Sequence, residues 1–178
     1  RSPQRPPRAP APRYLPNPWR VVPEPPTRSL LASCLRDSRD LAKPTRPVPQ
    51  PGVDEVLVQV SAVGVCGSVV HYYLHGRIGD FVVESPMILG HESAGVIVAV
   101  GDSVSKSRVG QRVSIEPGVP DLSCPELLAG RYHLCPNLRF FATPPTDASL
   151  ARFLPVPHAF SPPVPAPPVR MRLRWQPP

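Results

Sequence analysis

Apolar and polar residues alternate in several short stretches of the chain, and this pattern predicts β-strands. Residues 55–65, EVLVQVSAVGV, alternate at first and then become continuously apolar, which is typical of a strand that enters a buried sheet. Residues 94–100, AGVIVAV, form a second Val-rich run that ends at Gly101-Asp102, a dipeptide that favours a turn. Both runs therefore predict strands of the core.

Two further stretches complete the predicted strands. Residues 112–115, RVSI, predict a short strand that ends at Pro117-Gly118. Residues 30–35 predict an edge strand, and the proline-rich residues 46–52 predict a stiff turn after it. Helical periodicity is weak, and the sequence has no internal repeat. We therefore expect a mostly-β fold, an irregular β-barrel of short strands joined by Gly/Pro turns.

Proline divides the chain into a middle segment and two flanks. Of the 30 prolines, 14 lie in residues 1–28 and 166–178, where few apolar side chains accompany them. Such segments bury too little apolar surface to offset the entropy lost on ordering. We expect both Pro/Arg-rich flanks to be disordered tails, and residues 29–165 to form one domain.

The formal net charge of +7 is carried by the flanks. Residues 1–28 hold six Arg and one Glu, residues 166–178 hold three Arg, and the segment between them has a net charge of −1. Arg–Pro tails can bind nucleic acid or acidic surfaces weakly, but no nucleic-acid-binding motif accompanies them. We expect solvated tails without a nucleic-acid partner.

The sequence contains few motifs that indicate a cellular compartment or a nucleotide cofactor. The sequence contains no apolar run of about 18 residues and no apolar segment near its start, so it predicts neither a membrane span nor a signal peptide. Four scattered cysteines favour a cytoplasmic chain with some metal-ligating thiols over a disulfide scaffold. The 11 glycines form no G-x-G-x-x-G, the fingerprint of a dinucleotide-binding site.

Three side chains that can ligate a metal lie among Gly-rich or apolar neighbours. They are Cys66 in GVCGS, and His91 and Glu92 in LGHES. A thiolate, an imidazole and a carboxylate form an open ligand set for catalytic zinc, with a position left for water or substrate. Without further context, a buried structural Cys and an unrelated His would explain the same residues.

Residues 90–95, GHESAG, belong to a series of motifs in a fixed order, and Gly101 and Val104 follow them at a characteristic spacing. The other motifs are GVCGSVVHYYLHGRIGDFVVESPMILGHE, IEPGVP and GRYHLCPNLRFFATPP. Over residues 29–165 the chain resembles zinc-dependent medium-chain alcohol dehydrogenases, in particular the sorbitol/xylitol (polyol) dehydrogenase branch. The resemblance implies a GroES-like catalytic domain, a catalytic zinc, and NAD(P)-linked oxidation of a polyol's secondary alcohol to a ketone.

The resemblance also identifies the zinc ligands. Cys66, His91 and Glu92 match the zinc-site positions, with Glu92 in place of a Cys that other alcohol dehydrogenases supply from later in the chain. Where the family has CGSD, whose Asp hydrogen-bonds the zinc-binding histidine, this chain has Val69. Loss of such a carboxylate typically costs about 10–100-fold in metal affinity or activity.

Four further residues match positions with roles in the reaction. Ser68 matches the hydroxyl that contacts the substrate oxygen, and His71 matches the histidine that passes the proton to solvent. Tyr72 and Phe141 match residues that line the substrate pocket. Each also has a structural interpretation: Ser68 could cap a turn, His71 could be an exposed polar residue, and the two aromatics could belong to the core.

Other positions depart from the family pattern. The lobe that can carry a structural zinc has four cysteines spaced C-x2-C-x2-C-x7-C, and here these positions hold Asp121, Cys124, Leu127 and Cys135. Two thiolates are too few, so we expect the structural zinc to be lost. Further along, Arg152 occupies a position that is acidic in the family.

The largest departure is the missing fingerprint for a Rossmann nucleotide-binding domain. We therefore expect a truncated polyol dehydrogenase catalytic domain that is inactive alone and would need a nucleotide-binding partner. Two alternatives remain open. One is a zinc-binding pseudoenzyme module without turnover, and the other is a basic interaction protein that acts through its disordered tails.

Overall fold

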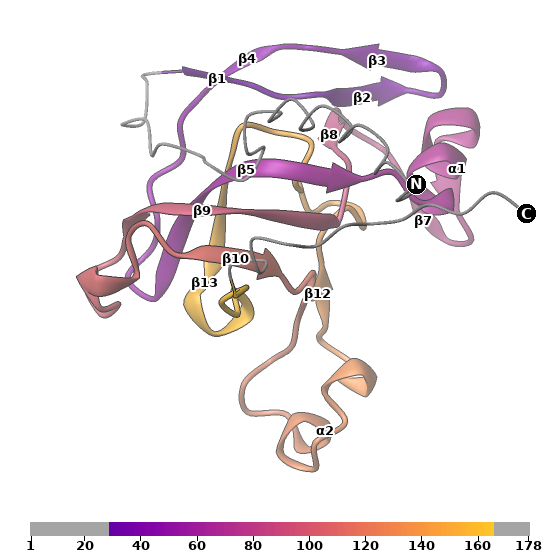
Figure 1. Ribbon diagram of the computed structural model, residues 1–178. Coiled ribbons are helices and arrows are strands. Elements are labelled where there is room, and N and C mark those ends of the chain that lie inside the picture. The colour runs from indigo at the N-terminus through magenta and orange to yellow at the C-terminus, as the bar shows by residue number, and fades with distance from the viewer. Residues whose placement is uncertain (1–28, 166–178) are drawn as a thin grey trace, which may run out of the picture.

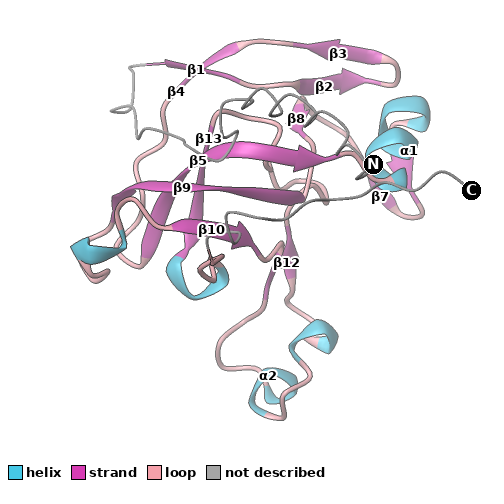
Figure 2. Ribbon diagram, in the orientation of Figure 1, coloured by secondary structure: helices cyan, strands magenta, loops and turns pink. Residues whose placement is uncertain are grey.

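The computed structural model describes residues 29–165, so the two predicted disordered tails lie outside the described residues. Within this range the chain is mostly β-structure with a few short helices (Figures 1 and 2). The largest sheet is antiparallel and has the strand order β10-β9-β5-β13. Its strands are β5 (Glu55–Gly64), β9 (Glu92–Val100), β10 (Arg112–Ile115) and β13 (Phe153–Pro157).

The other strands in the described part of the chain form four smaller sheets, with the orders β3-β2-β8, β1-β4, β6-β7 and β11-β12. Their bounds are β1 (Ser29–Leu31), β2 (Cys34–Asp37), β3 (Asp40–Ala42), β4 (Thr45–Pro47), β6 (Arg77–Ile78), β7 (Phe81–Val82), β8 (Met87–Ile88), β11 (Gly118–Val119) and β12 (Arg139–Phe140). Each ladder is short, and such short ladders are not stable without packing against the rest of the fold.

The longest helix among residues 29–165, α1 (Gly67–His75), directly follows β5. It ends at Gly76, whose φ of 68° lies in the left-handed region and whose N–H donates to the Tyr72 carbonyl at 2.8 Å. The remaining helical segments are α2 (Pro125–Leu128), η1 (Lys106–Arg108), η2 (Tyr132–Leu134) and η3 (His158–Phe160). None of these helices is long and apolar enough to cross a lipid bilayer.

The first half of the central strand β5 is buried on both faces, whereas its second half, which the sequence predicted to become buried, is exposed or half-buried. Val56 and Val58 belong to the larger cluster of buried side chains, whereas Leu57 points the other way into a smaller cluster with Phe153. Successive side chains of a strand alternate between faces, so this strand has a core on each side. Burying each such side chain contributes about 1.5–3 kcal/mol, which explains the three consecutive apolar residues Val56, Leu57 and Val58.

A glycine allows β9 to approach β5 closely. A Cβ at Gly95 would collide with the backbone carbonyl of Gln59 on β5. Gly95 lies opposite Val60, next to a shift in the pairing register of the two strands. The strand pair therefore depends on the absence of a side chain at this position.

The structure confirms the predicted mostly-β fold, the two core strands at β5 and β9, and the short strand at β10. The single edge strand predicted over residues 30–35 is wrong, because β1 and β2 are separate there. The Ser33 N–H donates to the Leu150 carbonyl at 2.7 Å between them. This contact lets β1 pair with β4 while β2 pairs with β3 and β8.

Candidate metal centre

Pairing between β5 and β9 assembles the three predicted ligands. Gly64, the last residue of β5, lies opposite Glu92, the first residue of β9. Cys66 follows β5 as the N-cap of α1, and His91 directly precedes β9. Because the strands are antiparallel, the end of one meets the start of the other, which brings together residues that are distant in the sequence.

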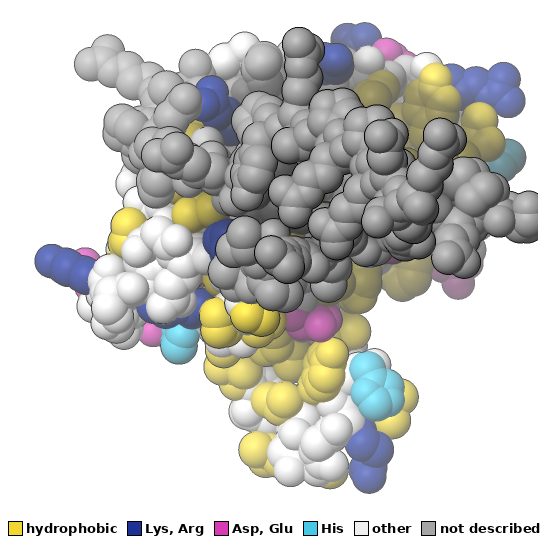
Figure 3. Space-filling model, in the orientation of Figure 1, with side chains coloured by type: hydrophobic (Ala, Val, Ile, Leu, Met, Phe, Trp, Pro, Cys, Tyr) yellow, Lys and Arg dark blue, Asp and Glu magenta, His cyan; other side chains and the backbone are white. Residues whose placement is uncertain are grey.

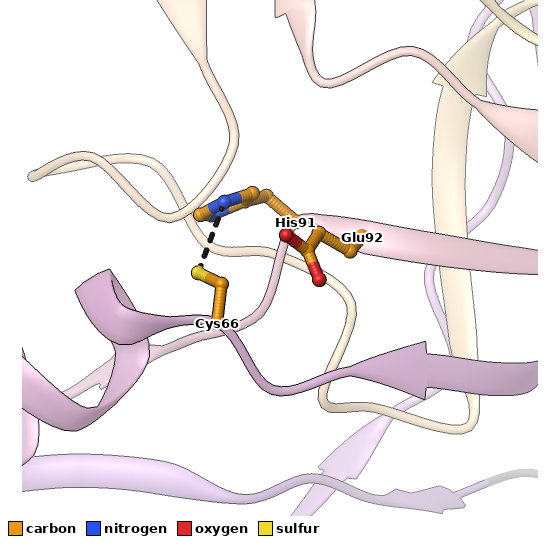
Figure 4. Close-up of side chains that lie close together, drawn as sticks. All are labelled: Cys66, His91 and Glu92. Carbon is orange, nitrogen blue, oxygen red and sulfur yellow. Dashed lines mark hydrogen bonds between the residues drawn. The ribbon is translucent and has the colours of Figure 1, made fainter. Parts of the chain in front are cut away.

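The ligating atoms of Cys66, His91 and Glu92 all lie within 4.8 Å of one another. The Cys66 Sγ is 3.4 Å from the His91 Nε2, and the Glu92 carboxylate extends toward the same space (Figure 4). Cys66 and His91 are half-buried, and Glu92 is exposed. In the described part of the chain this is the one group of three or more such residues close enough to hold a metal ion.

Gly64 makes room for the Glu92 side chain. A Cβ at this position would collide with the Glu92 Oε2, and it would also press on the Glu92 Cβ at 3.0 Å. The carboxylate therefore lies over the backbone of β5, where only glycine leaves enough space. The donor set, with one sulfur, one nitrogen and one oxygen on the rigid ends of two strands, fits zinc.

The surroundings of Cys66 favour its thiolate. Partial burial by itself would raise the pKa of the thiol, and the Glu92 carboxylate acts in the same direction. The Ser68 hydroxyl, whose Oγ is 2.8 Å from the Sγ, and the N–H groups of Ser68 and Val69 outweigh both effects, so the pKa of Cys66 is lowered. These N–H groups belong to the first turn of α1, which is an environment that stabilises a thiolate.

The other predicted site residues lie at different distances from this cluster. Ser68 contacts Cys66 directly. His71 is exposed one turn further along α1, and its ring contacts His75 instead of the cluster.

Tyr72 and Phe141 are buried in the larger core cluster. Burial raises the pKa of the Tyr72 hydroxyl, and a hydrogen bond with Thr143 opposes this effect. Their roles in substrate binding stay predictions.

One aromatic contact was missed by the sequence reasoning. The ring of Phe140 meets the His91 ring nearly edge-on, with centroids 5.4 Å apart and planes inclined by 67°. Phe140 and Phe141 are adjacent on and after β12, so their side chains take opposite directions, and Phe141 enters the core. The Phe-Phe pair was therefore a usable signal, since only one of two neighbours can face inward.

Val69 lies in the core at the position where the family pattern has an aspartate. Within residues 29–165, no carboxylate hydrogen-bonds to His91, whose close polar contact is the Cys66 thiol. The valine that replaces the aspartate of the family pattern therefore changes the surroundings of His91. The side chain that would orient the imidazole is replaced by one that packs into the core.

A second pair of cysteines lies in a projecting lobe, residues 119–138, which extends away from the central sheet around α2 (Figures 1 and 3). The Cys124 Sγ accepts the Leu127 N–H, and the Cys135 Sγ accepts the Asp121 N–H, both at 3.4 Å. The Asp121 carboxylate turns to Ser123 and Asn137. The predicted loss of a structural zinc from this lobe stays a prediction.

Comparison with known proteins identifies a family and relatives that this chain resembles. Residues 52–166 match the model of the alcohol dehydrogenase GroES-like domain family. The chain is 49% identical to the sorbitol dehydrogenase of Bacillus subtilis over 127 residues, which are 71% of this chain and 36% of that protein. It is 54% identical to the D-xylulose reductase of Saccharomyces cerevisiae over 100 residues, 56% of this chain and 28% of that protein.

Solved structures agree with the family match. An oxidoreductase/dehydrogenase of unknown specificity from Escherichia coli superposes with a TM-score of 0.71 at 37% identity, over 77% of this chain and 40% of that one. L-idonate 5-dehydrogenase from Escherichia coli gives a TM-score of 0.71 at 28% identity, over 78% and 40%. The chain spans about a third of the length of the curated relatives that it matches.

Proposed function

The chain belongs to the alcohol dehydrogenase GroES-like domain family, and we propose that residues 29–165 are the zinc-binding catalytic domain of a polyol dehydrogenase. The observation that carries the proposal is the cluster of Cys66, His91 and Glu92, whose ligating atoms lie within 4.8 Å of one another. The relatives named as sorbitol dehydrogenase and D-xylulose reductase support a polyol as the substrate class.

In this proposal the Cys66 thiolate, the His91 Nε2 and a Glu92 carboxylate oxygen hold one zinc ion. The lowered pKa of Cys66 supports its role, because a thiol must lose its proton to ligate a metal. When bound, zinc lowers the pKa of an alcohol to about 7, which makes oxidation possible near neutral pH. The exposed side of the cluster, at Glu92, leaves a path for substrate.

Ser68 and His71 would move the proton of the substrate hydroxyl. Ser68 lies beside the cluster with its Oγ 2.8 Å from the Cys66 Sγ, so its hydroxyl can also accept a proton from an alcohol bound there. His71 is exposed on the same helix and can release that proton to water. Tyr72 and Phe141 would line the substrate pocket in this proposal.

The described residues contain no sequence motif for binding a nicotinamide cofactor. Residues 29–165 contain no G-x-G-x-x-G turn, and the relatives share only about a third of their length with this chain. We infer that the hydride acceptor is bound by a different polypeptide segment, and that residues 29–165 bind zinc without oxidising polyols on their own.

A second candidate function is a zinc-binding module that has lost turnover. The observation that favours it is Val69, which leaves His91 without the carboxylate partner of the family pattern. The two candidates differ in one respect that can be measured. Only the first predicts NAD(P)-dependent polyol oxidation once a nucleotide-binding domain is supplied in trans.

The test is the zinc content of the purified full chain, measured by elemental analysis for the parent and two cysteine variants. We expect about one zinc per chain in the parent and in Cys124→Ala, and none in Cys66→Ala. No zinc in the parent would contradict both candidate functions. Zinc that is retained in Cys66→Ala would show that the metal is bound elsewhere.

A further inference from the structure

Two histidines outside the three-residue cluster lie one turn apart on α1. His71 and His75 are at positions i and i+4 of the helix, so both side chains project from the same face. Their ring centroids are 4.5 Å apart, and the ring planes are inclined by 50°. The two imidazoles are thus already beside each other, and small rotations can turn one nitrogen of each ring toward a shared point.

The ring nitrogens of this pair are not used by the fold. Both residues are exposed, and among residues 29–165 neither imidazole forms a hydrogen bond or an ion pair with a protein group. A neutral imidazole carries one nitrogen with a free lone pair. His71 and His75 therefore present two such donors to solvent, at a separation fixed by the helix.

We propose that His71 and His75 form a second metal site, which binds a borderline divalent transition ion such as Ni²⁺, Cu²⁺ or Zn²⁺. Two histidines at i and i+4 on one helix face are the arrangement by which a helix holds zinc in H-E-x-x-H proteins. Imidazole suits these ions, whereas Mg²⁺ and Ca²⁺ prefer oxygen ligands. With two protein ligands, water fills the remaining positions and the ion exchanges readily.

This site differs from the Cys66 cluster in its donors and in its exposure. It has no thiolate and no carboxylate ligand, so we expect it to bind zinc more weakly than the cluster and to fill second. Occupation would engage the His71 lone pair and slow the release of a proton from Ser68. That consequence rests on the proposed function, whereas metal binding by the pair does not.

The test is calorimetric titration of the untagged full chain with Ni²⁺, after the Cys66 cluster has been loaded with zinc. We expect the parent to bind one Ni²⁺ and His75→Ala to lose this binding. The double variant Tyr73→His/His75→Ala keeps the number of histidines but moves the second one to i+2, on another face of the helix, and should also lose it. The matched control, His133→Ala, removes an exposed histidine of the projecting lobe and should bind Ni²⁺ like the parent.

Nickel binding that is equally tight in the parent and in His75→Ala would overturn the proposal, as would a parent that binds no Ni²⁺. Alanine is the strongest helix former, so α1 should persist in His75→Ala, and far-ultraviolet circular dichroism checks this. The zinc content of each variant is measured separately. A failure of the proposed catalytic zinc site would therefore appear as missing zinc in the parent before nickel is added, whereas the comparison of the parent with His75→Ala reports on the histidine pair.

Discussion

Cys66 and Cys124 both occupy the N-cap of a helix, but the two thiols have opposite properties. Cys66 caps α1 and has a lowered pKa, whereas Cys124 caps α2 and has a raised pKa. Burial is the main cause at Cys124, and the neighbouring Cys135 thiol adds to it. At Cys66 the Ser68 hydroxyl and two N–H groups overcome the effect of burial. The same local position thus lowers the pKa of the thiol in one region and raises it in the other.

The two regions also differ in how their ligands are held. The ligands around Cys66 sit on the ends of β5 and β9, the most extensively paired strands of the described fold. The cysteines of the projecting lobe are held by short turns, in which Asp121 accepts the Cys124 N–H and donates its own N–H to Cys135. A sheet fixes three different donors at one point, whereas the lobe keeps two thiols close with no third ligand beside them.

The largest expected effect tests the sheet against the lobe. Gly95→Ala should lower the free energy of unfolding by about 3 kcal/mol, because the new Cβ collides with the Gln59 carbonyl. Gly130→Ala in the lobe, where φ is +75° and no atom lies near the Cβ, should cost only about 1 kcal/mol. Urea denaturation measures the free energy of unfolding of both variants. Equal losses would show that the sheet and the lobe respond alike to an added methyl group.

The next effect concerns the space beneath Glu92. Gly64→Ala should weaken zinc binding by about 10–100-fold, because the added methyl group displaces the Glu92 carboxylate. Gly67→Ala is the matched control, since a Cβ there meets nothing within 4 Å, and its zinc affinity should not change. Competition with a chelator measures the affinities.

A shorter carboxylate should partly restore zinc binding to the Gly64→Ala variant. Glu92→Asp in that background draws the carboxylate away from the new Cβ, although the contact with the Cβ of residue 92 remains. If the double variant binds zinc no better than Gly64→Ala alone, the glycine acts on something other than Glu92.

The pKa difference predicts a difference in thiol reactivity. In the metal-free chain, iodoacetamide should alkylate Cys66 several-fold faster than Cys124 at neutral pH, because only the thiolate reacts. The midpoint of the rise in rate with pH should lie below the ordinary thiol pKa for Cys66 and above it for Cys124. Peptide mass spectrometry identifies the modified residue. Ser68→Ala should move the Cys66 profile to higher pH, and an unchanged profile would argue against the hydroxyl as the cause.

The smallest effect is expected in the lobe. Cys124→Ala removes the sulfur that accepts the Leu127 N–H, and it should cost about 0.5 kcal/mol of stability. Thermal unfolding followed by circular dichroism measures this loss. A loss as large as that of Gly95→Ala would show that the lobe is integral to the fold and not a local appendage.

The sequence predicted the strands of the central sheet because β5 and β9 are apolar and Val-rich in an obvious way. It did not predict α1, whose sequence GSVVHYYLH contains β-branched and aromatic residues that are neutral or weak helix formers. The helix is fixed instead by tertiary contacts of Val69 and Tyr72 and by the left-handed cap at Gly76.

The three metal-ligating residues were predictable from their types and from the motifs around them. Their convergence was not, because it depends on the register that places Gly64 opposite Glu92. The Phe-Phe pair indicated that one of the two rings faces away from the core, but its contact with His91 depends on which residues lie nearby in space.

The order of strands in the central sheet has a consequence for how the chain folds during synthesis. Strand β13 pairs with β5 across most of the described chain, from Phe153 opposite Gln59 to Pro157 opposite Glu55. Until β13 leaves the ribosome, β5 is an edge strand with unpaired backbone groups and an uncovered apolar face. Closing so long a loop is slow, so the nascent chain spends time in a state that is prone to aggregate. A chaperone that shields β5 would act on the same strand that later positions the metal ligands.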